Sequence, residues 1–204
     1  MSRPLRVTAV VGTLSSPSKT TALVELILRT LAARTDIESR LVELHSLGPA
    51  FATTVERDGL GADAEDALRA VEEADLVIAA TPVFRGSYTG LFKHFFDLVD
   101  PYGLAATPVL LAATGGSDRH ALVIEHAMRP LFGFLQAWTA PAGIYLSAGD
   151  FDGTTILNPE VYERIEMAVG DVVPVARALA EARTTTTATT ATTATTAKTA
   201  HAPA

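Results

Sequence analysis

The sequence predicts a doubly wound α/β domain with a five-stranded, mostly parallel sheet. Short apolar runs alternate with helical segments across residues 1–183, and the connections between them are short. Three of these runs end in loops built from glycine, proline and hydroxyl residues. Because parallel strands end at one edge of a sheet, we expect the three loops to converge there and to form the ligand site.

The first half of the chain predicts two strands and two helices. A β-branched run over 5–11 is the first strand, and Ser18 is a suitable N-cap for the helix that follows it. The run 37–44 interleaves charged with apolar residues, which predicts a strand near the edge of the sheet. Residues 63–74 predict a helix with acidic residues in its first turn, where the helix dipole favours them.

The second half continues the alternation. The run 76–80 is apolar throughout and predicts a buried central strand. Further elements are predicted as a helix over 90–99, a strand over 108–113, a helix over 118–136, a strand over 142–147 and a closing helix over 160–183. Residues 184–204 are almost entirely threonine and alanine with nothing large to bury, so we expect a disordered tail without function.

Composition narrows the function. The 204 residues are 48% hydrophobic and carry a formal net charge of −7, which supports one core but offers no basic face for nucleic acid. The chain has no cysteine, which excludes thiol nucleophiles, thiolate zinc sites and iron–sulfur clusters and fits the reducing cytoplasm. No apolar stretch approaches the length needed to cross a membrane. We expect a cytoplasmic protein that binds a small molecule.

The first loop has the composition of a phosphate site. It places hydroxyls and backbone N–H groups at a helix N-terminus, with Ser15, Ser18, Lys19 and Thr20 as candidate contacts. A dinucleotide fingerprint needs three glycines where only Gly12 is present, and a Walker A loop needs a glycine where Ser18 stands. The alternative is that Ser18 only caps the helix and Lys19 is solvated.

The second and third loops carry a family resemblance. Residues 81–93 resemble the Pro-x-Tyr-x-x-Ser-x-x-Gly-x-Leu-Lys signature of NAD(P)H-dependent FMN reductases, and residues 12–18 resemble the phosphate loop of that family. Residues 114–123 and 129–132 are similar to the branch that supplies reduced flavin to sulfonate monooxygenases. The resemblance extends over about residues 5–182.

The resemblance implies a flavodoxin-like fold with FMN as cofactor and NADPH or NADH as hydride donor. By carry-over, the phosphate would contact Thr13, Ser15, Ser18 and Thr20, and Lys19 remains a candidate from the loop itself. The flavin ring would contact Pro82, Val83, Phe84, Arg85, Gly86 and Ser87, and its pyrimidine edge would contact Thr114, Gly115, Gly116 and Ser117.

Two positions depart from the family pattern. Ser15 stands where many relatives have arginine, so a charge-assisted phosphate contact is lost, and whether Lys19 compensates stays open. Phe84 stands where tyrosine is common, which keeps an aromatic wall but removes its hydroxyl. Phe84 could instead pack beneath the loop, and Arg85 could either attract a cofactor phosphate or be solvated.

His126 is a further candidate at the cofactor site. It precedes Pro130 by four residues, and the proline ring removes the N–H that would bond to the His126 carbonyl, so the helix must bend or widen. The resemblance implies a π-type bulge here, at a subunit interface near the flavin. The alternative is an ordinary proline-kinked helix with a partly exposed histidine.

The three loops contain no Ser/His/Asp order, no metal-ligand cluster and no paired carboxylates. We therefore assign no catalytic residue and no metal, and expect the cofactor to perform hydride transfer from nicotinamide C4 to flavin N5 while the protein binds and orients. The resemblance implies a homodimer or homotetramer that takes free flavin and nicotinamide and supplies FMNH2 to a two-component, sulfonate-type flavin monooxygenase. The alternatives are an FMN-bound quinone or azo reductase and a flavodoxin-type electron carrier.

Overall fold

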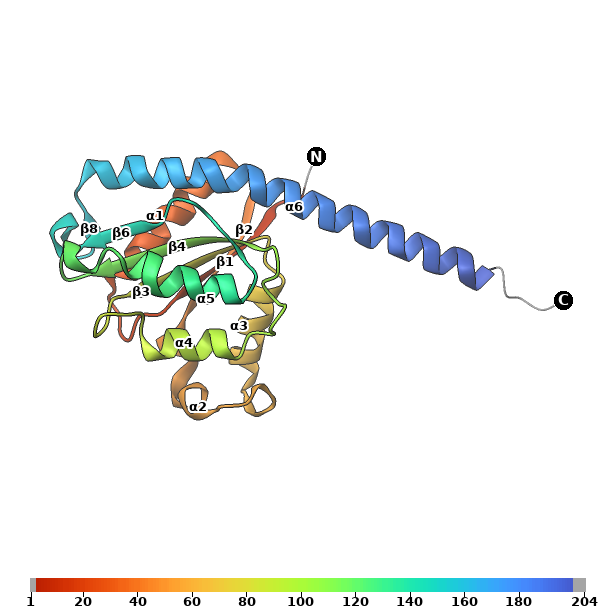
Figure 1. Cartoon of the computed structure of the whole chain (residues 1–204), viewed down its shortest axis with the longest axis horizontal. Helices are drawn as coiled ribbons and strands as arrows, with labels where there is room; N and C mark the ends of the chain where they lie inside the picture. Colours follow the sequence, from red (N-terminus) through yellow and green to blue (C-terminus); the bar gives the residue numbers. More distant parts are fainter. Residues whose placement is uncertain (1–2, 200–204) are drawn as a thin grey trace.

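The computed structural model describes the chain from Arg3 to Thr199. A central parallel sheet has helices on both faces, and the C-terminal helix continues well beyond the body of the molecule (Figure 1). Helices α1 and α6 lie on one face of the sheet, and α3, α4 and α5 lie on the other (Figure 1). This is the doubly wound α/β architecture that the sequence predicts.

The sheet has the strand order β2-β1-β3-β4-β5, and β6 also pairs with β4. The strands are β1 (Leu5–Val11), β2 (Ile37–Glu43), β3 (Leu76–Pro82), β4 (Pro108–Gly115), β5 (Trp138–Thr139) and β6 (Ile144–Ser147). All of these pairs are parallel. The chain passes from β1 to β2 and then returns across β1 to β3, so the strand order reverses between β1 and β3.

The fifth position of the sheet is shared by two short strands. β5 pairs with the start of β4 and β6 pairs with its end, so both lie beside the same neighbour. The strand predicted over 142–147 is therefore present only in its later part, and β5 was missed. Pro141, which has no N–H to donate to the ladder, stands in the interruption between the two segments.

Two apolar cores fill the space between the sheet and its helical layers. Alternate residues of β1 point to opposite faces, as the period of two in a strand requires. Val10 packs with the α3, α4 and α5 side, whereas Ala9 and Val11 pack with the α1 and α6 side. β1, β3 and β4 are buried almost throughout, whereas β2 is mostly exposed, which confirms its predicted place at the edge.

The helices follow the predicted order, with several shorter elements added. They are α1 (Lys19–Arg34), α2 (Gly48–Thr53), α3 (Ala62–Glu72), α4 (Gly90–Asp97), α5 (Arg129–Phe134) and α6 (Pro159–Thr199). Single 3-10 turns occur at Leu44–Leu47, Arg57–Gly59, Asp118–His120 and Ala148–Asp150. A small antiparallel hairpin, β7 (Phe151–Asp152) with β8 (Thr155–Ile156), precedes α6 and was not predicted.

The single helix predicted over 118–136 is broken in the structure. A π-helix spans Ile124–Met128 and leads into α5, with the Arg129 N–H donating to the Ile124 carbonyl five residues earlier. Pro130 supplies no N–H and its ring crowds the preceding turn, so the helical ladder widens before it. The predicted widening around His126 is confirmed.

The end of the chain is the segment expected from the sequence to be a disordered tail. α6 continues from Pro159 to Thr199, and only residues 200–204 of the predicted tail lie outside the described part. Within the described residues, no helix combines the length and apolarity needed to cross a membrane.

Candidate functional site

The three predicted loops meet at the carboxyl edge of the sheet. Val11 pairs with Ala80, and Pro82 pairs with Thr114, so β1, β3 and β4 end side by side. The Val83 N–H donates to the Thr114 carbonyl at 2.7 Å, which joins the second loop directly to the third. The structure therefore brings together the residues that the sequence assigned to phosphate, ring and pyrimidine edge.

Buried threonine hydroxyls hold the loops to one another. The hydroxyls of Thr20 and Thr114 lie 2.7 Å apart and join the start of α1 to the end of β4. The Thr89 hydroxyl donates to the Gly12 carbonyl at 2.7 Å and so joins the second loop to the first. The Thr89 N–H in turn donates to the Thr81 hydroxyl at 3.3 Å. Thr20 and Thr114, predicted as cofactor contacts, thus use their hydroxyls to connect the loops.

Thr89 and Thr81 were not predicted as parts of the site. Thr89 has a local signal that could have revealed it, because it stands one residue before α4 and its hydroxyl accepts from the Phe92 N–H as an N-cap. Its second bond, to Gly12, joins residues 77 positions apart in the chain. This contact exists only because β1 pairs with β3, so it could not be predicted from the local sequence.

The first loop offers hydroxyls at a helix N-terminus, where the Thr21 hydroxyl of the first turn donates to the Glu43 carboxylate at 2.7 Å. Ser18 caps α1 by accepting from the Thr21 N–H at 3.3 Å, and the first turn of α1 contains no acidic residue. Ser15 is exposed, whereas Thr13 is buried and donates to the Ser15 carbonyl at 3.0 Å. The Lys19 ammonium lies 5.2 Å from the centroid of the Phe151 ring. Ser18 therefore caps the helix as the alternative proposed, while the positive end of the helix dipole favours an anion at this loop.

Gly12 allows the first loop to pack closely on α4. A Cβ at this position would lie 2.9 Å from two carbon atoms of the Phe92 side chain. Phe92 is fully buried and stacks against Phe96 with ring centroids 4.8 Å apart, so it has little room to move. A side chain at residue 12 would therefore displace the loop.

The second loop is a tight hairpin with an arginine at its tip. Phe84 and Ser87 exchange two backbone hydrogen bonds of 2.8 and 3.2 Å, while Arg85 and Gly86 have φ angles of 52° and 87°. These angles define a type I′ turn, in which a non-glycine residue at Arg85 is uncommon. Phe84 is 51% exposed, so it does not pack beneath the loop, and its ring lies 5.7 Å from the Arg85 guanidinium carbon.

The third loop is shaped by a tyrosine beneath it. The Tyr145 hydroxyl donates to the Ser117 carbonyl at 2.6 Å, and a Cβ at Gly115 would lie 2.1 Å from the same hydroxyl oxygen. Around Gly116 there is open space. Burial raises the pKa of Tyr145, and the negative charges of Asp118 and Asp150 raise it further. Tyr145 was not predicted as a site residue.

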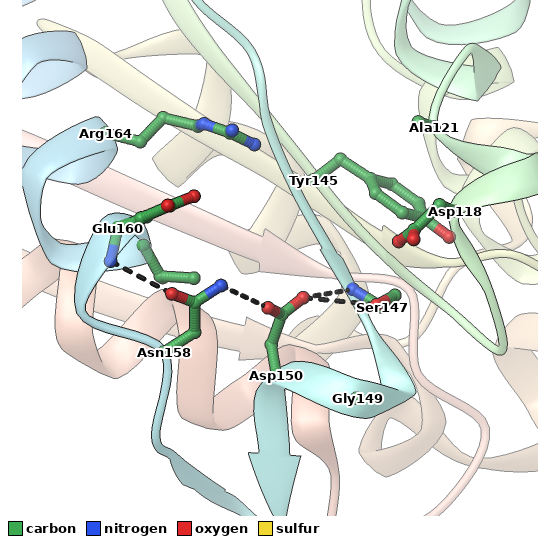
Figure 2. Close-up of a pocket in the computed structure, with 10 residues that line it drawn as sticks. Asp118, Ala121, Tyr145, Ser147, Gly149, Asp150, Asn158, Glu160 and Arg164 are labelled. Carbon is green, nitrogen blue, oxygen red and sulfur yellow. Dashed lines mark hydrogen bonds between the residues drawn. The ribbon is translucent and has the colours of Figure 1, made fainter.

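A polar pocket adjoins the third loop. It has a volume of about 500 Å³ and is lined by residues that include Asp118, Tyr145, Asp150, Glu160 and Arg164 (Figure 2). Asp150 accepts from the Ser147 N–H and from the Asn158 amide, both at 2.7 Å. Burial alone would raise the pKa of Asp150, but these hydrogen bonds hold it below its usual value.

His126 lies outside the three loops. It is exposed on the π-helix and lines a groove of about 760 Å³ between that segment and α4. The groove is mostly apolar, with Phe134 80% exposed at its side, and it also includes Tyr88 from the end of the second loop. His126 therefore belongs to none of the three loops, but it lines the same groove as Tyr88 of the second loop.

The chemistry of the site suits a flat, anionic ligand. The first loop has a helix N-terminus, the second an exposed aromatic ring and an arginine, and the third an open glycine. Across residues Arg3–Thr199, no three metal-ligating side chains lie close enough together to hold a metal ion. FMN, with a terminal phosphate and a planar ring, fits these residues.

Fold and site together define a flavodoxin-like protein of the flavin-binding oxidoreductase class. A family model described as NADPH-dependent FMN reductase matches residues 5–152. The chain belongs to this family. The predictions of an NAD(P)H-dependent enzyme that acts with FMN are thereby confirmed.

Similar proteins of known sequence or structure agree with this assignment. The NADH-dependent FMN reductase SfnF of Pseudomonas fluorescens is 47% identical over 175 residues, which are 86% of this chain and 94% of that protein. An FMN reductase (NADPH) of Pseudomonas aeruginosa is 43% identical with the same coverage of both chains. The structure of an oxidoreductase from Corynebacterium diphtheriae matches with a TM-score of 0.72 and 34% identity, over 85% of this chain and 97% of that one.

Proposed function

We propose that this FMN reductase oxidises NADH or NADPH, reduces FMN, and releases the reduced flavin to a flavin-dependent monooxygenase of the two-component, sulfonate type. The convergence of the three loops at one sheet edge, held by Thr20, Thr114 and Thr89, is the observation that carries the proposal. It supports the proposal because the helix end proposed to bind the phosphate and the hairpin proposed to bind the ring are joined by hydrogen bonds at one edge of the sheet.

The first loop would hold the phosphate. The phosphate would lie near the N-terminus of α1, where the helix dipole favours an anion, and would contact Ser15, Ser18 and Lys19. Thr13 and Thr20 would act by shaping the loop, because both are buried and use their hydroxyls inside the protein. Lys19 is the only positively charged side chain assigned to the phosphate. The electrostatic attraction of this site for the phosphate is therefore moderate.

The second and third loops would hold the ring. Val83, Phe84 and Ser87 would flank it, with Pro82 and Gly86 setting the shape of the hairpin. Gly115, Gly116 and Ser117 would approach the pyrimidine edge, where backbone N–H groups can meet carbonyl oxygens. Bound FMN supplies the ring that accepts a hydride from the reduced nicotinamide. The protein orients the two rings and excludes water.

Assembly and partners complete the proposal. The apolar groove beside His126, with Phe134 exposed, would be covered by a second copy of the chain in a homodimer or homotetramer. A cytoplasmic setting supplies the reduced nicotinamide. Release to a monooxygenase is supported by the similarity to SfnF, itself named as an FMN reductase, and by the lack of an arginine at Ser15.

One experiment separates this function from its rivals. Purified protein is mixed with free FMN and NADH, or with NADPH, under anaerobic conditions, and bleaching of the flavin absorbance is followed. Rapid reduction of excess free FMN is expected. A parallel reaction contains a quinone in place of FMN. Reduction of the quinone without reduction of free FMN would support a quinone reductase instead. Absence of NADH and NADPH oxidation in both reactions would point to an electron carrier.

A further inference from the structure

We propose that Tyr145 is a positioning residue for flavin binding, which acts by holding the third loop in the shape that presents its backbone N–H groups to the ligand. This inference rests on the proposed placement of the flavin ring against Gly115, Gly116 and Ser117.

The contacts of Tyr145 with the loop are close and specific. Tyr145 is the second residue of β6, where it pairs with Ala113 of β4, and its hydroxyl donates to the Ser117 carbonyl at 2.6 Å. The same oxygen occupies the space that a side chain at Gly115 would need, 2.1 Å from the position of a Cβ. The loop is thus shaped by Tyr145 at both of its ends.

The segment between these two contacts has unused hydrogen-bond donors. Across the described part of the chain, the N–H groups of Gly116 and Ser117 donate to no protein atom. The Ser117 carbonyl, by contrast, accepts from both Tyr145 and the His120 N–H, the latter at 3.2 Å. The carbonyl is therefore fixed inward while the two N–H groups stay free for a ligand oxygen.

The phenol is suited to this role at neutral pH. Tyr145 is only 9% exposed, and burial together with Asp118 and Asp150 raises its pKa, so the hydroxyl keeps its proton and donates. Figure 2 shows the Tyr145 side chain beside Asp118 on one wall of the polar pocket, opposite Arg164. A loop held in its binding shape before the ligand arrives loses less conformational entropy on binding.

The test compares two tyrosines that each donate to a backbone carbonyl. Tyr145→Phe removes the bond to Ser117, and Tyr162→Phe removes a similar 3.0 Å bond from α6 to the Ile156 carbonyl, outside the loops. We expect Tyr145→Phe to weaken binding of FMN and of riboflavin by the same factor, about five- to tenfold, from the usual net worth of one hydrogen bond. The KM for FMN should rise with little change in kcat, and Tyr162→Phe should leave both flavin affinities unchanged.

A double-mutant cycle adds a second measurement. Gly115→Ala should weaken flavin binding because its methyl group collides with the Tyr145 hydroxyl, and Tyr145→Phe in the same chain should restore part of the loss. Unchanged flavin affinity in Tyr145→Phe, or a fall in melting temperature as its only effect, would overturn the proposal. Failure of the wild-type protein to reduce FMN would instead refute the proposed function itself.

Discussion

The hydroxyl oxygens of Thr20 and Thr114 lie 2.7 Å apart in the interior, although the two residues are 94 positions apart in the sequence. Both residues are buried, with exposures of 1% and 6%. Thr20 begins the helix behind the proposed phosphate site, and Thr114 leads into the loop at the proposed pyrimidine edge. This hydrogen bond therefore joins the two ends of the proposed ligand site directly.

Removing one of these hydroxyls should cost more than removing both. Thr20→Val leaves the Thr114 hydroxyl buried without its partner, which we expect to lower the free energy of unfolding by about 1–3 kcal/mol and to weaken FMN binding. In the double variant Thr20→Val/Thr114→Val no polar group is stranded, so much of the stability should return. Urea unfolding of Thr20→Val, Thr114→Val and the double variant measures this coupling, and strictly additive losses would contradict it.

Ser18→Ala should separate phosphate binding from ring binding. The change removes the cap of α1 and one proposed phosphate contact, so we expect a loss of about 1 kcal/mol in stability and weaker FMN binding. Riboflavin lacks the phosphate, and its affinity should be lower than that of FMN in the wild type and little altered in the variant. Fluorescence titration with both flavins is the measurement. An equal loss for both would place the phosphate elsewhere.

Arg85→Ala should affect the nicotinamide more than the protein's stability. Arg85 is exposed at the tip of the hairpin, and it makes no ion pair with any described residue, so its guanidinium is available for a phosphate. We expect the KM for NADPH to rise more than that for NADH, because NADPH carries an additional phosphate. Arg29→Ala, on an exposed position of α1, is the matched control. Equal KM values for wild type and Arg85→Ala would leave Arg85 as a solvated residue.

His126→Ala should change the flavin cycle with little effect on folding. The side chain is exposed, so its loss should lower the melting temperature only slightly. If the groove beside it is covered by a second subunit near the flavin, flavin retention or release of reduced flavin should change. Co-purified flavin, nicotinamide oxidation with free FMN, and thermal stability are measured together. A clear loss of stability with an unchanged flavin cycle would make His126 a packing residue.

Acid should destabilise the protein through carboxylates that are held charged in the fold. Hydrogen bonds from Arg57 and then Arg69 lower the pKa of Glu65 from 4.5 to about 2. Burial would raise the pKa of Asp75, but Arg3 and the Arg6 N–H hold it below its usual value. A depressed pKa means that this stability is complete above the unfolded pKa and is lost as the pH falls through the folded one. Urea unfolding from pH 5 to 2 should show this decline, and Asp75→Asn should flatten it.

The sequence by itself determined the order of the strands and helices and the family. The apolar runs that became β1, β3 and β4 are buried on both faces, so their composition alone marks them, and the three loops follow them directly. Pro130 likewise predicted the widened helix, because proline lacks a backbone N–H in any fold. Such local properties can be predicted from the sequence alone, because they do not depend on contacts between distant residues.

The tertiary structure alone decided which groups hold the site together. The bonds from Thr20 to Thr114, from Thr89 to Gly12 and from Tyr145 to Ser117 join residues 94, 77 and 28 positions apart. Whether such hydroxyls face a ligand or one another depends on strand register and on the angle at which α1 and α4 meet the sheet. No local propensity encodes these relationships, because they arise only when distant segments pack together.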